Sequence, residues 1–218
     1  NAFILSHTSM PAEIPEQHVI DDFLGKYVAH WRTDVENPTT FGNIIGPAYY
    51  YKVRRAMQEA QHHAKKLIPQ IAQEWKKASG FFHGDLLEYY NCEGAEHILL
   101  SMGAIGAESK IAIDELKKQG HKIGLARVRV LRPFPTEEII SLGKQADLIV
   151  IDRNISIGLE GALFNEVKAA LYGRSDAKAT GFIAGLGGKD VTYQDIQTMC
   201  KKAMKGTQQD QEWYAMEG

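Results

Sequence analysis

Apolar and polar positions follow two different rhythms along this chain of 218 residues. After about residue 86, short apolar runs alternate with segments whose apolar residues recur every three or four positions. The short runs indicate strands covered on both faces, and the longer rhythm indicates amphipathic helices. The strands are expected at 98–101, 122–130, 148–151 and 179–184, and the helices at 103–119, 137–144, 161–172 and 193–204. This alternation predicts an α/β domain over residues 86–206, a doubly wound and mostly parallel sheet.

A proline-rich turn marks the end of one of these strands. The apolar run that begins at Val128 stops at Pro133 and Pro135, which enclose Phe134. Proline lacks the backbone N–H that a sheet needs, so the strand should end here. We expect Thr136 to cap the following helix, with acidic residues in its first turn near the positive end of the helix dipole.

The first 80 residues have a different pattern. Residues 1–47 contain four scattered prolines and predict an irregular arm, with a short strand at 2–6, that wraps around a neighbouring domain. Residues 48–80 predict a long helix that links two bodies and ends at Gly80. Pro69 should kink this helix or split it in two. Residues 207–218 are expected to form a tail. The apolar face of the long helix consists of Val53, Met57, Ala60, Ala64, Leu67, Ile68, Ile71 and Trp75.

Composition narrows the class of protein. The net charge of -2 argues against nucleic-acid binding. The sequence contains no apolar run of the roughly 20 residues that cross a bilayer, and no signal peptide. The two cysteines, Cys92 and Cys200, lack the spacing of a metal or cluster site, which favours a reducing cytoplasm. Because the chain starts in an apolar run without methionine, we expect it to be an internal part of a longer protein.

Two strand–helix loops are candidate ligand sites, because ligands favour the carboxyl ends of parallel strands. The first contains Ser101, Gly103 and Gly106, and its backbone N–H groups could hold an anion at a helix start. Tight packing of the helix on the strand is the alternative interpretation. The second loop follows the most apolar strand. It contains Arg153, Asn154 and Ser156, preceded by Asp152 and followed by Gly158. These residues could bind a polar ligand, form an internal ion pair or reach a subunit interface.

A third candidate loop follows the last strand. Gly185, Gly187 and Gly188 indicate positive φ angles or a close approach of backbone. Asp190 follows Lys189 where a Walker phosphate loop needs serine or threonine, so nucleotide hydrolysis is not expected. The scattered histidines and the absence of a nucleophile elbow lead us to predict neither a catalytic residue nor a metal site.

Five segments, in order along the chain, together resemble the alpha subunit of 2-oxoacid:ferredoxin oxidoreductases, most of all the pyruvate type. The turn around Pro133 also resembles the one in the carboxyl-terminal domains of transketolase-like enzymes. The segments lie at 3–7, 101–106, 128–135, 152–158 and 181–188. The resemblance implies that the parent enzyme oxidatively decarboxylates pyruvate with thiamine diphosphate and magnesium, passes electrons through iron–sulfur clusters to ferredoxin, and transfers the acyl group to coenzyme A.

By the same resemblance, this chain would be the carboxyl-terminal part of that subunit. Residues 1–47 would be the tail of a missing thiamine-diphosphate-type domain, and 86–206 a transketolase C-terminal-like domain with a role in assembly. The segment alone would bind no cofactor and have no activity, and its partners would be the other subunits in a cytoplasmic oligomer. A branched-chain 2-oxoacid enzyme is one alternative. A freestanding domain that binds an anion or another small molecule through the glycine loops is the other.

Overall fold

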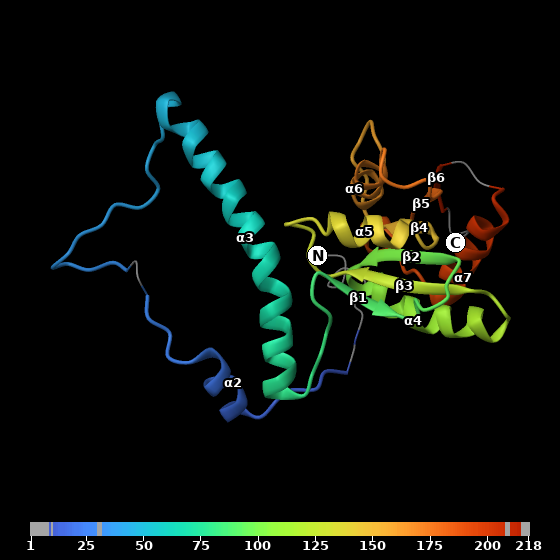
Figure 1. Cartoon of the computed structure of the whole chain (residues 1–218), viewed down its shortest axis with the longest axis horizontal. Coiled ribbons are helices and arrows are strands. Elements are labelled where there is room, and N and C mark those ends of the chain that lie inside the picture. Colours follow the sequence, from blue (N-terminus) through green and yellow to red (C-terminus); the bar gives the residue numbers. More distant parts are fainter. Residues whose placement is uncertain (1–8, 10, 30–31, 208–209, 215–218) are drawn as a thin grey trace. The chain divides into compact units, whose positions relative to one another are not determined.

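A computed structural model describes residue 9 and residues 11–29, 32–207 and 210–214 (Figure 1). The expected strand at residues 2–6 lies outside the described part. The chain divides into two compact units: residues 11–83 form one, and the α/β domain that begins at Gly84 forms the other. Each unit is described by itself.

The α/β domain is built on a six-stranded sheet with the strand order β1-β3-β2-β4-β5-β6. Only β1 is antiparallel to its neighbour, β3, and the other four pairings are parallel. The doubly wound, mostly parallel sheet predicted from the sequence is therefore confirmed. The strands are β1 (Leu87–Tyr90), β2 (His97–Met102), β3 (Ile123–Val128), β4 (Asp147–Asp152), β5 (Ala179–Ile183) and β6 (Gln211–Trp213).

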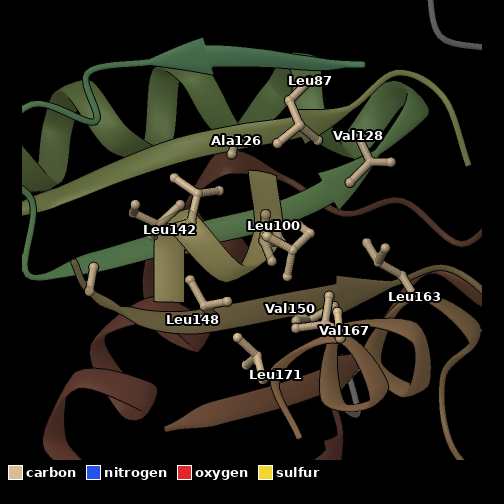
Figure 2. Close-up of a cluster of buried hydrophobic side chains, with 14 of the residues drawn as sticks. Leu87, Leu100, Ala126, Val128, Leu142, Leu148, Val150, Leu163, Val167 and Leu171 are labelled. Carbon is tan, nitrogen blue, oxygen red and sulfur yellow. The ribbon is translucent and has the colours of Figure 1, made fainter. Parts of the chain in front are cut away.

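Helices cover both faces of this sheet and create two apolar cores. The helices are α4 (Gly103–Lys118), α5 (Thr136–Gly143), α6 (Ala162–Leu171) and α7 (Tyr193–Lys205). Figure 2 shows the core beneath α5 and α6, where Leu100 and Val150 of the central strands face Leu142 and Val167. The opposite core joins Leu99 and other strand residues to α4 and α7. Successive side chains of β2 and β4 point into one core and then the other. Both faces of these strands are therefore buried, and their sequences are continuous apolar runs.

The strand predictions missed both edges of the sheet. β1 has a mixed sequence, Leu-Glu-Tyr-Tyr, in which only Leu87 is fully buried. β6 is three residues long and lies in the segment that we expected to be a tail. Edge strands bury only part of their surface, so neither sequence has the apolar run by which the four central strands were recognised.

The turn between β3 and α5 differs in one detail from its prediction. Helix α5 begins at Thr136 itself, and Pro135 occupies the capping position without a side-chain hydrogen bond. The prediction of Thr136 as the cap is therefore wrong. Glu137 and Glu138 do lie in the first turn, as expected from the helix dipole.

The described residues of the other unit include two helices, α2 (Gln17–Leu24) and α3 (Pro47–Ser79). Helix α3 continues without a break through Pro69, so of the two predicted outcomes, a kink or a split, the split is wrong. The helix ends at Gly80 in a left-handed conformation, as expected. The sequence did not predict α2. Phe23 of α2 packs edge-to-face on Trp75 of α3, with ring centroids 5.0 Å apart. No helix in the described part of the chain is long and apolar enough to cross a membrane.

Candidate functional site

The strand order places a topological switch point between β2 and β4. The chain leaves β2 through α4 toward β3 on one side, and then crosses through α5 to β4 on the other side. Ligands of open α/β sheets bind at the carboxyl ends of the strands at such a point. The three loops predicted as candidate sites follow β2, β4 and β5, so all of them begin at this edge of the sheet.

The loop after β2 is very short, because α4 begins at Gly103 directly after the strand. Gly103 has a φ of +63°, and a Cβ atom there would meet nothing within 4 Å. Gly106 is different, since a Cβ atom would lie 2.6 Å from Cγ of Arg127 on β3. The glycine thus permits close packing of α4 on a side chain of the sheet, as the alternative interpretation of this loop required.

Ser101 is fully buried near the end of β2. Its hydroxyl oxygen has no hydrogen-bond partner among the described residues. A buried hydroxyl without a partner is unfavourable by roughly 1–3 kcal/mol relative to a paired one. The hydroxyl is therefore an unused side-chain polar group in the first candidate loop.

The loop after β4 begins with a buried carboxylate that caps a helix. Asp152 is 1% exposed. Its two oxygens accept the backbone N–H groups of Leu163 and Phe164 at 3.0 and 2.9 Å. Asn154 accepts the N–H of Ala162 at 3.0 Å. Burial raises the pKa of Asp152 above its ordinary value, and the backbone N–H donors oppose that rise. Asp152 and Asn154 therefore use their acceptors on the first turn of α6.

Arg153 connects the second candidate loop to the third. Its guanidinium donates from Nε to the carbonyl of Gly185 at 2.9 Å and from Nη2 to the carbonyl of Lys189 at 2.6 Å. Gly185 has a φ of +72°, and a Cβ atom there would lie 2.7 Å from Arg153 Nε. The sequence left three alternatives open for this loop: a polar ligand, an internal ion pair or a subunit interface. The structure shows internal hydrogen bonds of Arg153, although their acceptors are backbone carbonyls and not an acidic side chain.

The glycines of the third loop adopt the expected conformations. Residues Leu186–Gly188 form a short 3-10 turn, in which Gly187 and Gly188 have φ angles of +67° and +86°. The loop therefore uses glycine for its backbone shape. Asp190 accepts the N–H of Val191 at 3.0 Å and leads into the capped start of α7.

Ser156 lies in a closed turn at the tip of the second loop. Its N–H donates to the carbonyl of Glu160 at 2.9 Å, and its own carbonyl accepts the N–H of Leu159 at 2.8 Å. Gly158, with a φ of +83°, permits the turn. The turn leaves Ile157 89% exposed and Leu159 65% exposed.

A small cavity of about 150 Å³ lies where the starts of α4 and α7 meet Arg153. The carboxylate of Glu108 in this cavity accepts the N–H of Tyr193 at 3.2 Å. Thr192 and Asp195 form a reciprocal capping box at the same helix start. The cavity is lined by Ala104, Ile105, Glu108, Arg153, Asp190, Val191 and Thr192. Its charged groups are thus largely engaged in holding two helices and a loop together.

The sequence predictions and the structure agree on where the candidate loops lie, but several residues that build this edge were missed. The capping box of Thr192 and Asp195 has a sequence signature that could have identified it. Glu108 and Gln211 have no such signature. Gln211 accepts the N–H of Gly161 at 3.0 Å from fifty residues away. The described residues contain no group of three or more His, Cys, Asp or Glu side chains placed to hold a metal ion.

Comparison with known proteins shows which family this chain is similar to. The family model of pyruvate:ferredoxin oxidoreductase core domain II matches residues 95–196. The pyruvate synthase subunit PorA of Pyrococcus furiosus is 40% identical over 211 residues, which cover 94% of this chain and 53% of the relative. The ketoisovalerate oxidoreductase subunit VorA of Pyrococcus horikoshii is 36% identical over 222 residues, covering 98% and 56%. The chain thus spans about half the length of these curated relatives.

Two solved structures match part of the chain with low scores. A 2-oxoglutarate:ferredoxin oxidoreductase from Magnetococcus marinus matches with a TM-score of 0.45 and 16% identity, over 73% of this chain and 24% of that one. A split-gene transketolase, an inactive β4 tetramer, matches with a TM-score of 0.43 and 17% identity, over 52% of this chain and 39% of that one.

Proposed function

Because residues 95–196 of this chain belong to the pyruvate:ferredoxin oxidoreductase core domain II family, we propose that the chain is the carboxyl-terminal part of the alpha subunit of such an enzyme. The parent enzyme would oxidise pyruvate to acetyl-coenzyme A and reduce ferredoxin. The observation that carries this proposal is the 40% identity to a pyruvate synthase subunit over 94% of the chain. A match of that extent includes most of both units, not the α/β domain alone.

Within that enzyme, the role of this segment would be structural. The second candidate loop supports this assignment, because the polar side chains of Asp152, Arg153 and Asn154 form hydrogen bonds with the protein's own backbone. Asp152 holds the start of α6, and Arg153 holds the loop that follows β5. Polar groups whose hydrogen bonds are already made within the chain fix the conformation of the loops at this edge of the sheet. A surface with a fixed conformation is suited to packing against another part of the enzyme.

The cofactors of the parent enzyme would be bound elsewhere. An iron–sulfur cluster needs four ligands, usually cysteines. This chain has only Cys92, packed on the core beneath α5 and α6, and Cys200, buried in the opposite core. The described residues therefore do not fit a cluster. Thiamine diphosphate with magnesium, the clusters and the coenzyme A site would belong to the missing part of the subunit and to partner subunits of a cytoplasmic, oligomeric complex.

A branched-chain substrate is the second candidate for the parent enzyme. It is favoured by the 36% identity to a ketoisovalerate oxidoreductase subunit over 98% of the chain. This identity is close to the 40% found for the pyruvate-type relative, so overall similarity does not separate the two substrates.

The experiment replaces the matching half of the Pyrococcus furiosus relative with this chain and combines the hybrid subunit with its partner subunits. We expect pyruvate-dependent reduction of methyl viologen that requires coenzyme A, and no reduction by this chain alone. A parallel assay with 2-oxoisovalerate distinguishes the two substrates. Activity of the isolated chain would contradict the structural role. A correctly assembled hybrid that oxidises neither acid would contradict the assignment to this enzyme class.

A further inference from the structure

The last described segment of the chain is joined to the edge of the sheet by backbone hydrogen bonds. This segment, residues 210–214, contains β6, and we call it the strap. The carbonyl of Asp210 accepts the N–H of Gly181 at 2.7 Å, and the N–H of Tyr214 donates to the carbonyl of Ile183 at 2.9 Å. The strap and the helices and strand that it contacts all belong to the α/β domain.

On one face of the sheet, the strap completes the start of α6. The first N–H groups of a helix have no acceptor within the helix itself. Here four consecutive N–H groups, those of residues 161–164, all donate to side chains. Asp152 and Asn154 accept three of them, and Gln211 of the strap accepts the fourth, from Gly161, at 3.0 Å. The start of α6 is therefore held in part by a side chain of the strap.

Two glycines leave room for the side chain of Gln211 to reach α6. Gly181 of β5 is the register partner of Gln211, and a Cβ atom there would lie 3.1 Å from Gln211 Nε2 and 3.0 Å from the ring of Phe164. A Cβ atom at Gly161 would overlap the carboxylate of Asp152. Side chains at these two positions would push the amide of Gln211 away from the helix.

On the opposite face of the sheet, the same strap holds α7. Successive side chains of a strand point to opposite faces, so the neighbours of Gln211 turn toward this helix. Glu212 forms an ion pair with Lys202 at 2.5 Å. The hydroxyl of Tyr214 donates to Oδ1 of Asp195 at 3.2 Å. The other oxygen of Asp195, Oδ2, accepts from Thr192 in the capping box, so the strap contacts the carboxylate that caps α7.

A short segment that is bonded to two helix starts would release both of them when it leaves the sheet. β6 has three residues, so few backbone hydrogen bonds hold it to β5. Proteins open locally in contiguous cooperative units, and the least stable units open most often. We propose that the strap is a conformational coupling device. While it is paired with β5 it orders the starts of α6 and α7, and when it detaches both helix starts loosen together.

This coupling connects two of the candidate loops. Helix α6 follows the second loop and α7 follows the third, and the strap reaches one from each face of the sheet. A change that displaces the strap would therefore alter both loops at once. The inference does not depend on the enzymatic assignment above.

Hydrogen exchange of single amides, followed by NMR on the complete chain, tests the coupling. The reporters are the N–H groups of Gly161 at α6, Thr192 at α7 and Tyr214 in the strap itself. Gln211→Met keeps the length of the side chain but removes the acceptor of Gly161, and Tyr214→Phe removes only the hydroxyl group. We expect either substitution to speed exchange at all three reporters by the same factor, roughly three- to tenfold, because the loss of one hydrogen bond makes the same opening more frequent.

Two control variants make the same chemical changes elsewhere in the domain. Gln145→Met and Tyr172→Phe alter exposed side chains and should leave the three rates unchanged. The amides of α5 should exchange at the wild-type rate in every variant. An effect of Gln211→Met confined to Gly161, or of Tyr214→Phe confined to α7, would overturn the proposal, because each side chain would then stabilise its own helix alone.

Two further results would also contradict the coupling. Unchanged rates in both strap variants would show that the side chains of the strap do not hold the helix starts. Faster exchange of α5 by the same factor as the reporters would show that the strap opens only when the whole domain unfolds.

Discussion

The carboxylate of Asp152 is the most deeply buried charged group described in the chain, at 1% exposure, and it caps α6 through two backbone N–H groups. Asp152→Ala would leave both donors buried without an acceptor. We expect a loss of about 1–3 kcal/mol in the free energy of unfolding, measured by urea denaturation. Asp176→Ala removes an exposed carboxylate and should cost far less. Equal losses in the two variants would show that the hydrogen bonds of Asp152 to α6 do not stabilise the fold.

Glu88 on β1 forms ion pairs with Lys110 at 2.5 Å and Arg127 at 3.2 Å. Burial disfavours its charge, but the hydrogen bond and charge of Lys110, together with Arg127, outweigh burial and lower the pKa of Glu88 below its ordinary value of 4.5. A lowered pKa in the folded state means that the unfolded chain binds more protons near this pH. The stability contributed by Glu88 is therefore present above pH 4.5 and is lost as the pH falls through the folded-state pKa.

Urea unfolding between pH 7 and about pH 3 measures this contribution. Wild type should be more stable than Glu88→Gln at neutral pH, and the gap should narrow once the pH drops below 4.5, the ordinary pKa of the carboxyl group. Glu93→Gln, which alters an exposed turn residue, should follow the wild-type curve throughout. A gap of constant size across the whole range would mean that the charge of Glu88 does not contribute.

Single residues were predicted with mixed success, for reasons that lie in their contacts. The positive φ angles of Gly185, Gly187 and Gly188 follow from residue type, so the sequence indicates them directly. The acceptors of Arg153 are backbone carbonyls at 185 and 189, which no pattern of residue types marks. The close contact of Gly106 with Arg127 likewise depends on how α4 lies on β3.

At the scale of elements, the packing of α4 on the sheet depends on Gly106, which lies against the side chain of Arg127 on β3. A Cβ atom at 106 would meet Cγ, Cδ and Nε of Arg127 at 2.6–3.0 Å, and Arg127 is held in place by Glu88. Gly106→Ala should therefore destabilise the domain by about 1–3 kcal/mol through overpacking, seen as a lower urea midpoint. Gly46→Ala, at an open position in the other unit, should leave the urea midpoint of the α/β domain unchanged. A neutral Gly106→Ala would mean that the Arg127 side chain or α4 shifts at no cost to make room for the added methyl group.

Elements with a continuous apolar run or a clear helical period were predicted, and those stabilised by long-range contacts were not. β2 and β4 are covered on both faces, and their sequences show it. β6 exists because it pairs with β5 and because Gln211 contacts the start of α6. Helix α3 remains continuous through Pro69, which the local rule against proline in a helix did not predict.

At the scale of the whole molecule, the family resemblance drawn from five weak motifs is confirmed by the match of residues 95–196 and by relatives at 36–40% identity. No single motif was specific, but their order along the chain was. Residue spacing alone would have given only an α/β domain with glycine loops. The choice between a structural segment and a freestanding binding domain therefore rests on whether those loops hold a ligand.

Thermal unfolding of the complete chain with added ligands decides that choice. A ligand present at 100 times its dissociation constant would stabilise the fold by about 2.7 kcal/mol, a shift of several degrees. We expect no shift with thiamine diphosphate and magnesium, coenzyme A, NAD, AMP or phosphate, because Arg153 is already bonded to backbone carbonyls and Gly106 is closed by Arg127. A shift with one anion that Arg153→Met abolishes would place a binding site at this edge of the sheet. The freestanding binding domain would then be the better account of the chain.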